Sequence, residues 1–312
     1  MSGFSYNISE KLEKILITID RHRTVILTTP ISPRNELKLR FEAQIDRLYA
    51  IFKFGEVEIP KSEIIKLLSG KRDKKISGAG QQILDFKSGF DAINCDWQVS
   101  DRNVSLRTVE NLFATVNRRL RFTANRDEIK NLLDFLQSSK EHPVVLSGIA
   151  AFQYEAIGSG GFAEGKIARL LSYLYLNKSG YDFRGLLKIE EGFLADRDNF
   201  REIFSQTLKS RNLTMFLEYF AKGISEQLAE AEKDAAEVRL HLNIPAGNFD
   251  INDRQKEILV LFEQPDMSLT NRKVQKLFSV SQITASRDLA GLATLGLIFA
   301  YGKGRSVHYT KA

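Results

Sequence analysis

The stretch HPVVLSGIAAFQYEAIGSGGFAEGKIARLLSYLYLNKSGYDF, residues 142–183, carries the clearest structural signal in this chain. Its apolar residues recur at spacings of three and four, which predicts helices over 143–157 and 166–178. The segment GSGG at 158–161 separates them and predicts a glycine-rich loop. Such a loop before a helix can hold an anion, because the first backbone N–H groups of a helix have no partner within it.

Helical spacing also dominates the sequence on both sides of this stretch, and strand signals are rare before residue 297. The further helices that we predict cover 8–27, 35–54, 58–68, 80–95, 105–120, 126–139, 189–209 and 213–239. We therefore expect a mainly α protein, with an N-terminal helical region over 1–95 and a helical core domain over 96–240. HLNIPAGNFD at 241–250 contains a proline and a glycine and predicts a linker, so that 251–312 forms a separate C-terminal domain.

The length and composition of the chain bound its class. Its 312 residues are too many for one small core and suit two domains. The single cysteine, Cys95, cannot form an internal disulfide and fits a reducing compartment, so we expect a cytoplasmic protein. No apolar run approaches the roughly 20 residues of a membrane helix, and the N-terminus lacks the basic start and apolar core of a signal peptide. We therefore expect no membrane partner.

Positive charge is concentrated near the C-terminus. From Thr270 onward the chain has seven lysines and arginines and one acid, Asp288, so this segment carries the entire net charge of +6. A basic excess that is confined to one patterned segment indicates a polyanionic partner. The alternative is a solvated basic tail, which the strong patterning of the segment disfavours.

The C-terminal segment predicts three helices followed by a β-hairpin. INDRQKEILVLFEQ, SLTNRKVQKLF and SVSQITASRDLAGLATLGL predict the helices, and Asn252 is the expected N-cap of the first. We expect Leu277 in the second helix, and Ile283 and Leu289 in the third, to face the core. IFAYGKGRSVHYTK at 298–311 predicts two strands joined by a turn, which the glycines of GKG allow.

This pattern resembles the winged helix-turn-helix of many bacterial transcription regulators, and also the C-terminal module of many Fic proteins. The resemblance implies that the N-terminal half of the third helix enters the major groove of DNA and that the hairpin forms a wing along the phosphate backbone. The implied DNA-binding residues are Arg272, Ser281, Gln282, Thr284, Ser286 and Arg287 from the helices, with Lys303 and Arg305 from the wing. The alternative use of such a module is protein docking or dimerisation.

The central stretch resembles the core of the Fic family, whose signature H-P-F-x-D/E-G-N-G-R-x-x-R lies on a loop that enters a helix. AFQYEAI at 151–157 matches the helix before that loop, and IARLLSYLYLNKSGY at 167–181 matches the helix after it. The resemblance covers nearly all of 1–240 and implies a helical Fic-like body. Fic enzymes transfer AMP from ATP to a hydroxyl side chain. They use a histidine as general base, an acid that holds magnesium, and two arginines and backbone N–H groups on the triphosphate.

The signature itself is altered in this chain. In a gap-free alignment, Gly158 replaces the histidine and Phe162 replaces the magnesium acid. Glu164 replaces the asparagine and Lys166 the first arginine, while Arg169 keeps the second. Loss of a general base alone typically lowers a rate by about 10²–10⁴-fold. We therefore expect no catalytic residue and no metal site.

A shifted alignment instead pairs Phe162, Glu164 and Gly165 with the family's F, D/E and G. It would restore a magnesium acid but still supplies no histidine. His142 lies a whole helix upstream of the loop, and we expect it to begin that helix rather than to act as a base.

Two further elements of the family are eroded. The inhibitory pattern S/T-x-x-x-E-G/N of many Fic proteins aligns with residues 51–56, where Ile51 replaces the hydroxyl residue, Gly55 replaces the glutamate and Glu56 follows. The target-binding flap is shortened to LRFTANRDEI at 120–129. Erosion of the catalytic, regulatory and target-binding parts together favours loss of the reaction.

We therefore expect a DNA-binding protein, a transcriptional regulator, in which a catalytically impaired Fic-like domain serves as the dimerisation or sensing body of a homodimer. We expect no resident cofactor; weak binding of ATP and Mg²⁺ would use Gly161, Glu164, Gly165, Lys166 and Arg169. One alternative is an active or weakly active AMP-transferase that the winged helix directs to its target. Another is a scaffold that binds a protein partner.

Overall fold

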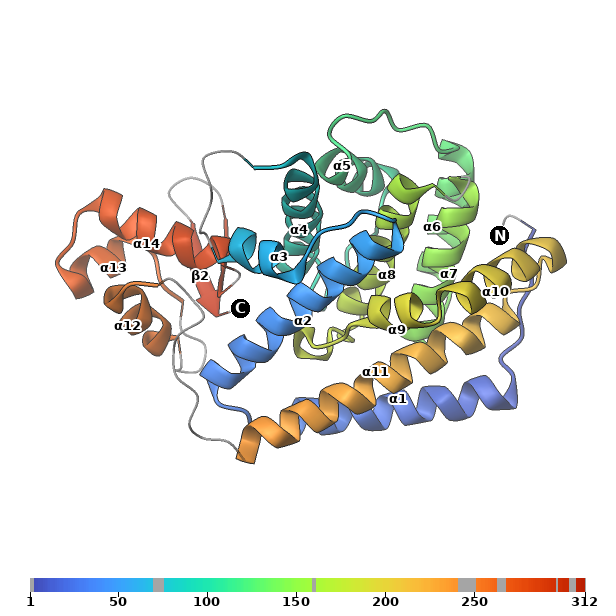
Figure 1. Ribbon diagram of the computed structural model, residues 1–312, viewed down its shortest axis with the longest axis horizontal. Helices are drawn as coiled ribbons and strands as arrows, with labels where there is room; N and C mark the ends of the chain where they lie inside the picture. The colour runs from blue at the N-terminus through green and yellow to red at the C-terminus, as the bar shows by residue number, and fades with distance from the viewer. Residues whose placement is uncertain are drawn as a thin grey trace.

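The computed structural model describes residues 3–69, 76–158, 161–240, 251–262, 268–295, 297–302 and 307–311. These residues are mainly helical and end in a two-stranded antiparallel sheet, which confirms the predicted fold class (Figure 1). The predicted linker over 241–250 and the predicted wing residues Lys303 and Arg305 lie outside the described residues. The predicted domain boundaries stay predictions.

Helices from the first part of the described chain form the larger part of the molecule, which we call the body. In chain order they are α1 (Glu10–Thr28), α2 (Pro33–Phe54), α3 (Lys61–Leu68), α4 (Gly78–Asp96), α5 (Leu106–Val116), α6 (Arg126–Ser138), α7 (Pro143–Ile157), α8 (Phe162–Lys178), the short 3-10 turn η1 (Phe183–Gly185), α9 (Ile189–Ala195), α10 (Arg197–Ser210) and α11 (Thr214–Leu240).

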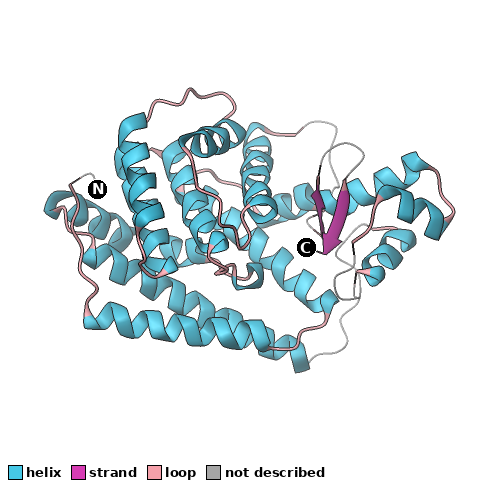
Figure 2. Ribbon diagram, turned by 180° about the vertical axis from the view of Figure 1, so that it is seen from behind, coloured by secondary structure: helices cyan, strands magenta, loops and turns pink. Residues whose placement is uncertain are grey.

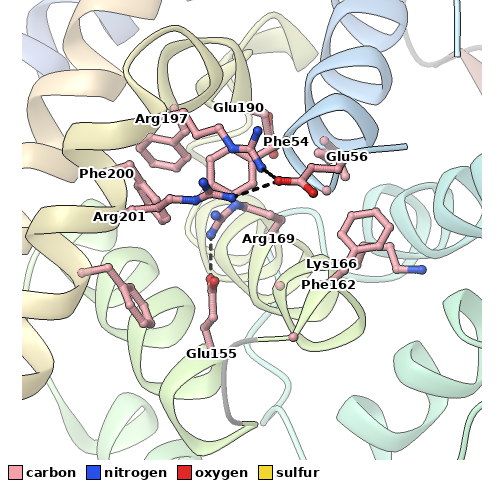
Figure 3. Close-up of a pocket in the computed structure, with 16 residues that line it drawn as sticks. Phe54, Glu56, Glu155, Phe162, Lys166, Arg169, Glu190, Arg197, Phe200 and Arg201 are labelled. Carbon is pink, nitrogen blue, oxygen red and sulfur yellow. Dashed lines mark hydrogen bonds and ion pairs between the residues drawn. The ribbon is translucent and has the colours of Figure 1, made fainter. Parts of the chain in front are cut away.

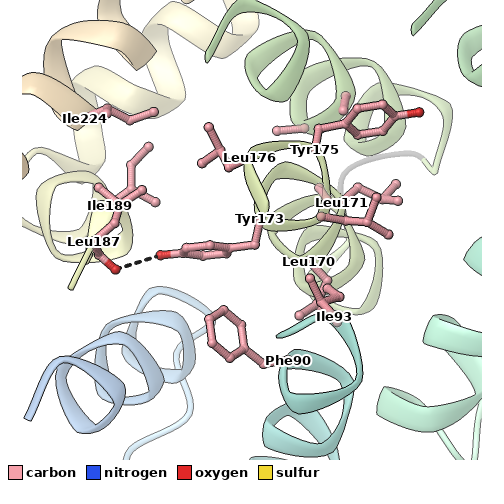
Figure 4. Close-up of a cluster of buried hydrophobic side chains, with 14 of the residues drawn as sticks. Phe90, Ile93, Leu170, Leu171, Tyr173, Tyr175, Leu176, Leu187, Ile189 and Ile224 are labelled. Atoms are coloured by element: carbon pink, nitrogen blue, oxygen red, sulfur yellow. Dashed lines mark hydrogen bonds between the residues drawn. The ribbon is translucent and has the colours of Figure 1, made fainter. Parts of the chain in front are cut away.

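The body is built around α7 and α8, which pack against each other and are buried on almost every side. Ile149 of α7 and Leu174 of α8 have no exposed surface. Figure 4 shows the surroundings of α8, where the rings of Tyr173 and Phe90 meet edge to face with centroids 5.0 Å apart. The Tyr173 hydroxyl also donates to the carbonyl oxygen of Leu187 at 3.1 Å. Helices that are apolar all round are expected at the centre of a helical domain.

The long helices α1 and α11 lie side by side along one edge of the body (Figure 1). The Ser9 hydroxyl at the start of α1 donates to Glu218 at 2.7 Å, and further along the pair His22 Nδ1 lies 2.6 Å from Glu232 Oε2. Because both contacts advance in the same direction, the two helices run parallel. The buried face of α1 agrees with the helix predicted over 8–27.

Two of the predicted helices differ from the structure. α8 begins at Phe162 rather than at 166, because Gly161 is its N-cap and the Phe162 ring packs edge to face on Phe52. The single helix predicted over 189–209 is divided into α9 and α10 at Asp196, whose backbone is not helical (φ −120°, ψ 42°). Because α8 begins earlier, Glu164, Gly165 and Lys166, which we predict to bind nucleotide, lie in its first turns.

The C-terminal residues form a second, smaller unit. It contains α12 (Asp253–Leu261), α13 (Asn271–Phe278), α14 (Gln282–Thr294), β1 (Ile298–Tyr301) and β2 (His308–Lys311). The unit has its own buried apolar cluster, which includes Ile258, Val274 and Leu289. Asn252 caps α12 as predicted, because its side chain accepts from the N–H of Gln255 at 2.9 Å. The two strands pair antiparallel along their whole length (Figure 2).

This C-terminal unit lies at one end of the molecule, beside α2 and α4 of the body (Figure 1). Leu37 of α2 packs against the apolar cluster of the unit, and β1 contacts α4. Across the described residues, no helix is both long and apolar enough to cross a membrane.

Candidate functional site

The end of α7 and the start of α8 lie close to a carboxylate of the chain itself, that of Glu164. Gly158 ends α7, and Gly161 begins α8 without a side-chain cap for the N–H groups of the first turn. Glu164 lies in that turn, with its side chain against Gly158 and Gly161. A Cβ placed on Gly161 would be 2.7 Å from Glu164 Oε2, and one placed on Gly158 would be 2.2 Å from Glu164 Cγ. The carboxylate therefore lies near the positive end of α8, where an external anion would otherwise bind.

Phe162, at the position of the magnesium acid in the gap-free alignment, packs against Gly55 at the end of α2. A Cβ placed on Gly55 would be 2.2 Å from ring atom Cε2 of Phe162. The same ring lies edge to face on Phe52, with centroids 5.8 Å apart. The ring thus fills the space that any side chain at position 55 would need. The two replacements predicted from the sequence therefore fit together, because the ring at position 162 fills the space that glycine leaves at position 55.

A cavity of about 380 Å³ opens beside this junction (Figure 3). Its volume lies within the range of small-molecule sites in proteins. Five phenylalanines line it: Phe54, Phe162, Phe193, Phe200 and Phe204. Four of the five residues predicted for nucleotide binding also line it: Gly161, Gly165, Lys166 and Arg169. The fifth, Glu164, does not line the cavity, because its side chain lies against Gly158 and Gly161.

The two cations predicted for phosphate binding already have partners. Arg169 is 7% exposed, and its Nη1 donates to Glu155 Oε2 at 3.2 Å. Its guanidinium carbon also lies 5.1 Å from the ring centroid of Phe193. Lys166 is 4% exposed, and its ammonium lies 5.0 Å from the ring centroid of Phe162. Burial is the main cause that lowers the pKa of Lys166.

A cluster of one glutamate and two arginines lies on another side of the cavity (Figure 3). Glu56 Oε1 accepts from Arg197 at 2.6 Å and from Arg201 at 3.4 Å. The hydrogen bond from Arg197 is the main cause that lowers the pKa of Glu56. Glu56 has a left-handed backbone (φ 62°), which glycine and asparagine adopt more easily. The inhibitory pattern aligned with residues 51–56 has glycine or asparagine at this position, and both residue types suit a left-handed backbone.

Glu190 supplies a buried carboxyl group to the cavity. It is 2% exposed, and its Oε2 accepts from the Tyr173 hydroxyl at 2.9 Å, while Oε1 has no partner among the described residues. Burial is the main cause that raises the pKa of Glu190.

None of the described residues that line the cavity is a histidine. His142 begins α7 as predicted, since its Nδ1 accepts from the N–H of Val144 at 3.2 Å. Within the described ranges, no group of three or more His, Cys, Asp or Glu side chains is arranged to hold a metal ion.

The sequence prediction did not include several charged residues of this cavity: Glu56, Glu155, Glu190, Arg197 and Arg201. They come from different elements that meet only in the folded chain. One signal was available, because the arginines of RDNFREIF recur at a spacing of four, and so do the phenylalanines Phe200 and Phe204. That spacing predicts one helix face that carries arginines beside aromatic rings.

The second candidate site is formed by α13 and α14. Residues 279–281 join the two helices, and Ser279 has a left-handed backbone (φ 49°) that ends α13. The Asn271 side chain donates to the carbonyl oxygen of Gln282 at 3.2 Å and to the Ser286 hydroxyl at 2.8 Å. These contacts fix the start of α14 against the start of α13.

The predicted DNA-binding side chains of α13 and α14 fall into two groups. Those of Arg272, Gln282 and Arg287 are exposed. Ser281 is also exposed, but it caps α14 and lies 2.9 Å from the Thr284 hydroxyl, so these two side chains also stabilise the helix start.

Asp288, the single acidic residue that follows Thr270 in the sequence, is buried. It is 3% exposed and accepts from Arg254 at 2.5 Å and from Asn252 at 3.1 Å. The exposed basic side chains of α13 and α14 are therefore not neutralised by the single acid that follows Thr270 in the sequence.

Two apolar residues of this unit are exposed, contrary to prediction. Ile283 is 67% exposed and Leu277 is 53% exposed. α14 begins at Gln282, so Ile283 lies in its first turn, ahead of the part that packs in the core. Leu289 is buried as predicted, and Ala285 is buried in place of Ile283.

No protein-family model matches this sequence, and no curated protein is similar to it in sequence. Solved structures are similar in fold. A Fic family protein from Desulfovibrio desulfuricans G20 aligns over 98% of this chain and 97% of its own, with 15% identity and a TM-score of 0.63. A Fic domain-containing signaling protein from Bacteroides thetaiotaomicron VPI-5482 aligns over 73% of this chain and 98% of its own, with 16% identity and a TM-score of 0.58.

A third structure, Fic-1 from C. elegans, aligns over 72% of this chain and 71% of that chain, with 16% identity and a TM-score of 0.59. At such low identity these likenesses concern the fold and not the activity. The body of this chain has the fold of Fic proteins, as the resemblance of its central stretch predicted.

Proposed function

We propose that this chain is a DNA-binding protein, a transcriptional regulator, whose C-terminal unit is a winged helix-turn-helix. The observation that carries the proposal is the exposed start of α14. Gln282 and Arg287 are free to reach a groove there, Arg272 lies on the preceding helix, and Asp288 is turned inward. In helix-turn-helix proteins the start of the second helix meets the base edges, while basic side chains hold the phosphates.

Exposed apolar surface on the same helix supports this proposal. Ile283 is 67% exposed at the start of α14, where an aliphatic side chain would contact the methyl group of thymine. We propose Gln282 and Ile283 for base contacts and Arg272 and Arg287 for phosphate contacts. Lys303 and Arg305, outside the described residues, stay proposed wing contacts.

We further propose that the Fic-like body does not transfer AMP at an appreciable rate. The Phe162 ring stands in place of a magnesium ligand, and the Glu164 carboxylate lies near the helix start where a phosphate would bind. Gly158 supplies no base. Loss of the base alone corresponds to roughly 3–6 kcal/mol of transition-state free energy. The body would then serve dimerisation or sensing in a cytoplasmic homodimer that binds paired half-sites.

Fluorescence anisotropy with a random duplex DNA across a salt series tests the proposal. We expect wild type to bind and to weaken steeply with salt, because phosphate contacts release counterions. Arg287→Ala and Arg272→Ala should each weaken binding and reduce the slope of log affinity against log salt by about one. Lys222→Ala, which removes an exposed lysine of the body, is the matched control and should bind as wild type does. Absence of binding at low salt would refute the DNA proposal and favour a protein-docking module.

Nucleotide binding in the body is a second candidate function, favoured by the retained Arg169 and by the 380 Å³ cavity. Calorimetry with millimolar ATP and Mg²⁺ tests it, with Arg169→Ala as the matched variant. Heat that is lost in the variant would support binding, and labelled ATP would then test AMP transfer. Absence of heat discards both the nucleotide site and the AMP-transferase alternative.

A further inference from the structure

The junction between the body and the C-terminal unit contains a second cavity. Its volume is about 370 Å³. Its walls come from α1, α2, α4, α8 and η1 of the body and from Phe299 of β1. This cavity shares no lining residue with the one beside the α7–α8 loop. A molecule bound here would touch both units at once.

Arg40 lies in this cavity near two carboxylates, Glu36 and Asp182, but forms an ion pair with neither among the described residues. Its guanidinium carbon lies 5.9 Å from the ring centroid of Phe299, and no hydrogen bond or ion pair of Arg40 occurs among the described residues. The nearby carboxylates are engaged elsewhere, since Glu36 accepts from Arg184 at 2.5 Å and Asp182 accepts from Gln98 at 3.2 Å. Burial is the main cause that lowers the pKa of Arg40, while the nearby Glu36 and Asp182 carboxylates act to raise it.

A further arginine of the cavity wall, Arg47, already has hydrogen-bond partners within the body. It is 3% exposed and donates to the Tyr173 hydroxyl at 2.9 Å and to the Leu187 carbonyl oxygen at 2.5 Å. Its guanidinium also lies 4.3 Å from the ring centroid of Phe90. Arg47 also forms a buried ion pair with Glu190 at 4.0 Å, so Arg40 is the arginine of the cavity wall whose N–H donors have no acceptor among the described residues.

The wall of the cavity beside Arg40 has an unusual backbone. Phe183, Arg184 and Gly185 follow one another with φ values of 48°, 57° and 74°. Two of these residues carry side chains that disfavour this conformation, and strained backbone of this kind is concentrated at functional sites. A Cβ at Gly185 would also make a tight contact, 3.3 Å from Arg40 Nε. The strained turn therefore leaves the Arg40 guanidinium room beside the cavity.

We propose that this junction cavity binds a small organic monocarboxylate. Arg40 would hold the carboxylate, and the apolar part would lie against the rings of Phe299 and Phe90. The N–H donors of the Arg40 guanidinium match the two oxygens of a carboxylate, and the aromatic walls favour a ligand with an apolar body. The cavity volume sets the size of the ligand to that of a small molecule.

Ligand binding here would influence the C-terminal unit directly. Phe299 belongs to β1, the strand that follows α14, and the cavity joins it to α2 and η1. A ligand that bridges these walls changes the free energy of docking between the two units, and so the position of α14. This consequence for DNA rests on the proposed function, whereas ligand binding itself does not.

The binding test uses the full chain and two readouts. Trp97, the only tryptophan, directly precedes the cavity residue Gln98, so its emission reports on this site. We would titrate acetate, hexanoate and benzoate to millimolar concentration, with benzamide as the uncharged match of benzoate, and record thermal unfolding beside the emission. We expect a saturable response to benzoate or hexanoate and none to benzamide.

Variants connect the response to Arg40. Arg40→Gln should weaken carboxylate binding at least tenfold, while Lys38→Gln, on the same helix but outside the cavity, should not. Arg40→Lys keeps the charge and serves if Arg40→Gln fails to fold. An equal response to benzamide, an unchanged affinity in a folded Arg40 variant, or no saturable response to any carboxylate would overturn the proposal.

DNA anisotropy with and without saturating benzoate then separates the two proposals. A shift in DNA affinity that disappears in Arg40→Gln is the expected result. Carboxylate binding without any DNA binding would support the proposed ligand site and refute the proposal that the chain is a DNA-binding regulator. DNA binding that no carboxylate alters would refute the coupling.

Discussion

The contact between Gly55 and Phe162 gives the sharpest test of the structure. A Cβ at position 55 would lie 2.2, 2.3 and 2.7 Å from three atoms of the Phe162 ring, so Gly55→Ala forces the ring to move. The Gly55 backbone itself accepts alanine, because its φ of −80° and ψ of 12° are ordinary. Overpacking of this kind typically costs about 1–3 kcal/mol. We expect Gly55→Ala to lower the free energy of unfolding by that amount.

A double-mutant cycle isolates the contact. In a Phe162→Ala background the ring is gone, and Gly55→Ala should be neutral or stabilise by about 0.4–1 kcal/mol, since alanine restricts the unfolded chain. Urea unfolding, followed by the emission of Trp97 in the body, measures all four proteins. Gly78→Ala is the matched control, because a Cβ there meets nothing within 4 Å. Equal destabilisation by Gly55→Ala in both backgrounds would refute the packing of Phe162 on Gly55.

Three further predictions concern charged side chains. Asp288→Ala should destabilise the C-terminal unit by about 1–3 kcal/mol in thermal unfolding, because Arg254 loses a buried acceptor. Glu56 has a lowered pKa, so wild type should unfold at a higher temperature than Glu56→Gln above pH 4.5, and this advantage should vanish as the pH falls below that value. Glu190 has a raised pKa, so its effect has the opposite sign: relative to Glu190→Gln, wild type should lose stability as the pH rises above 4.5. A pH-independent difference in unfolding temperature for either glutamate would contradict the assigned cause of its shift.

The helices could be predicted from the sequence because their apolar spacing is local information. The start of α8 could not, since it depends on Phe162 packing against Phe52 and Gly55, more than a hundred residues earlier in the chain. The same holds for the glutamate and arginines of the first cavity. Glu56 and Arg197 are far apart in sequence and meet only when α10 folds back over the end of α2. Local patterns thus predict the elements, whereas the charges that surround a cavity depend on their packing.

The Arg40 site illustrates the same limit in a different way. Within α2 the sequence shows Arg40 as one of several charged residues on an amphipathic helix, with no sign of its surroundings. Arg184 takes the Glu36 carboxylate as its partner, and the Phe299 ring lies beside the Arg40 guanidinium, which has no hydrogen-bond acceptor among the described residues. These partners lie in η1 and β1, so only the assembled junction distinguishes Arg40 from a solvated arginine.

The position of Glu164 bears on the two alignments of the signature, which sequence alone left open. The shifted alignment needs Glu164 to face bound nucleotide as a metal ligand. In the structure Glu164 is absent from the cavity lining and lies over Gly158 and Gly161, while Phe162 lines the cavity and fills the space beside Gly55. The gap-free alignment fits this arrangement, because it pairs the metal position with Phe162. To recover a magnesium site, Glu164 would have to leave the helix start and the ring would have to leave Gly55. A substitution at one position alone, such as Phe162→Asp, should therefore not restore metal binding, which calorimetry with Mg²⁺ and ATP can measure.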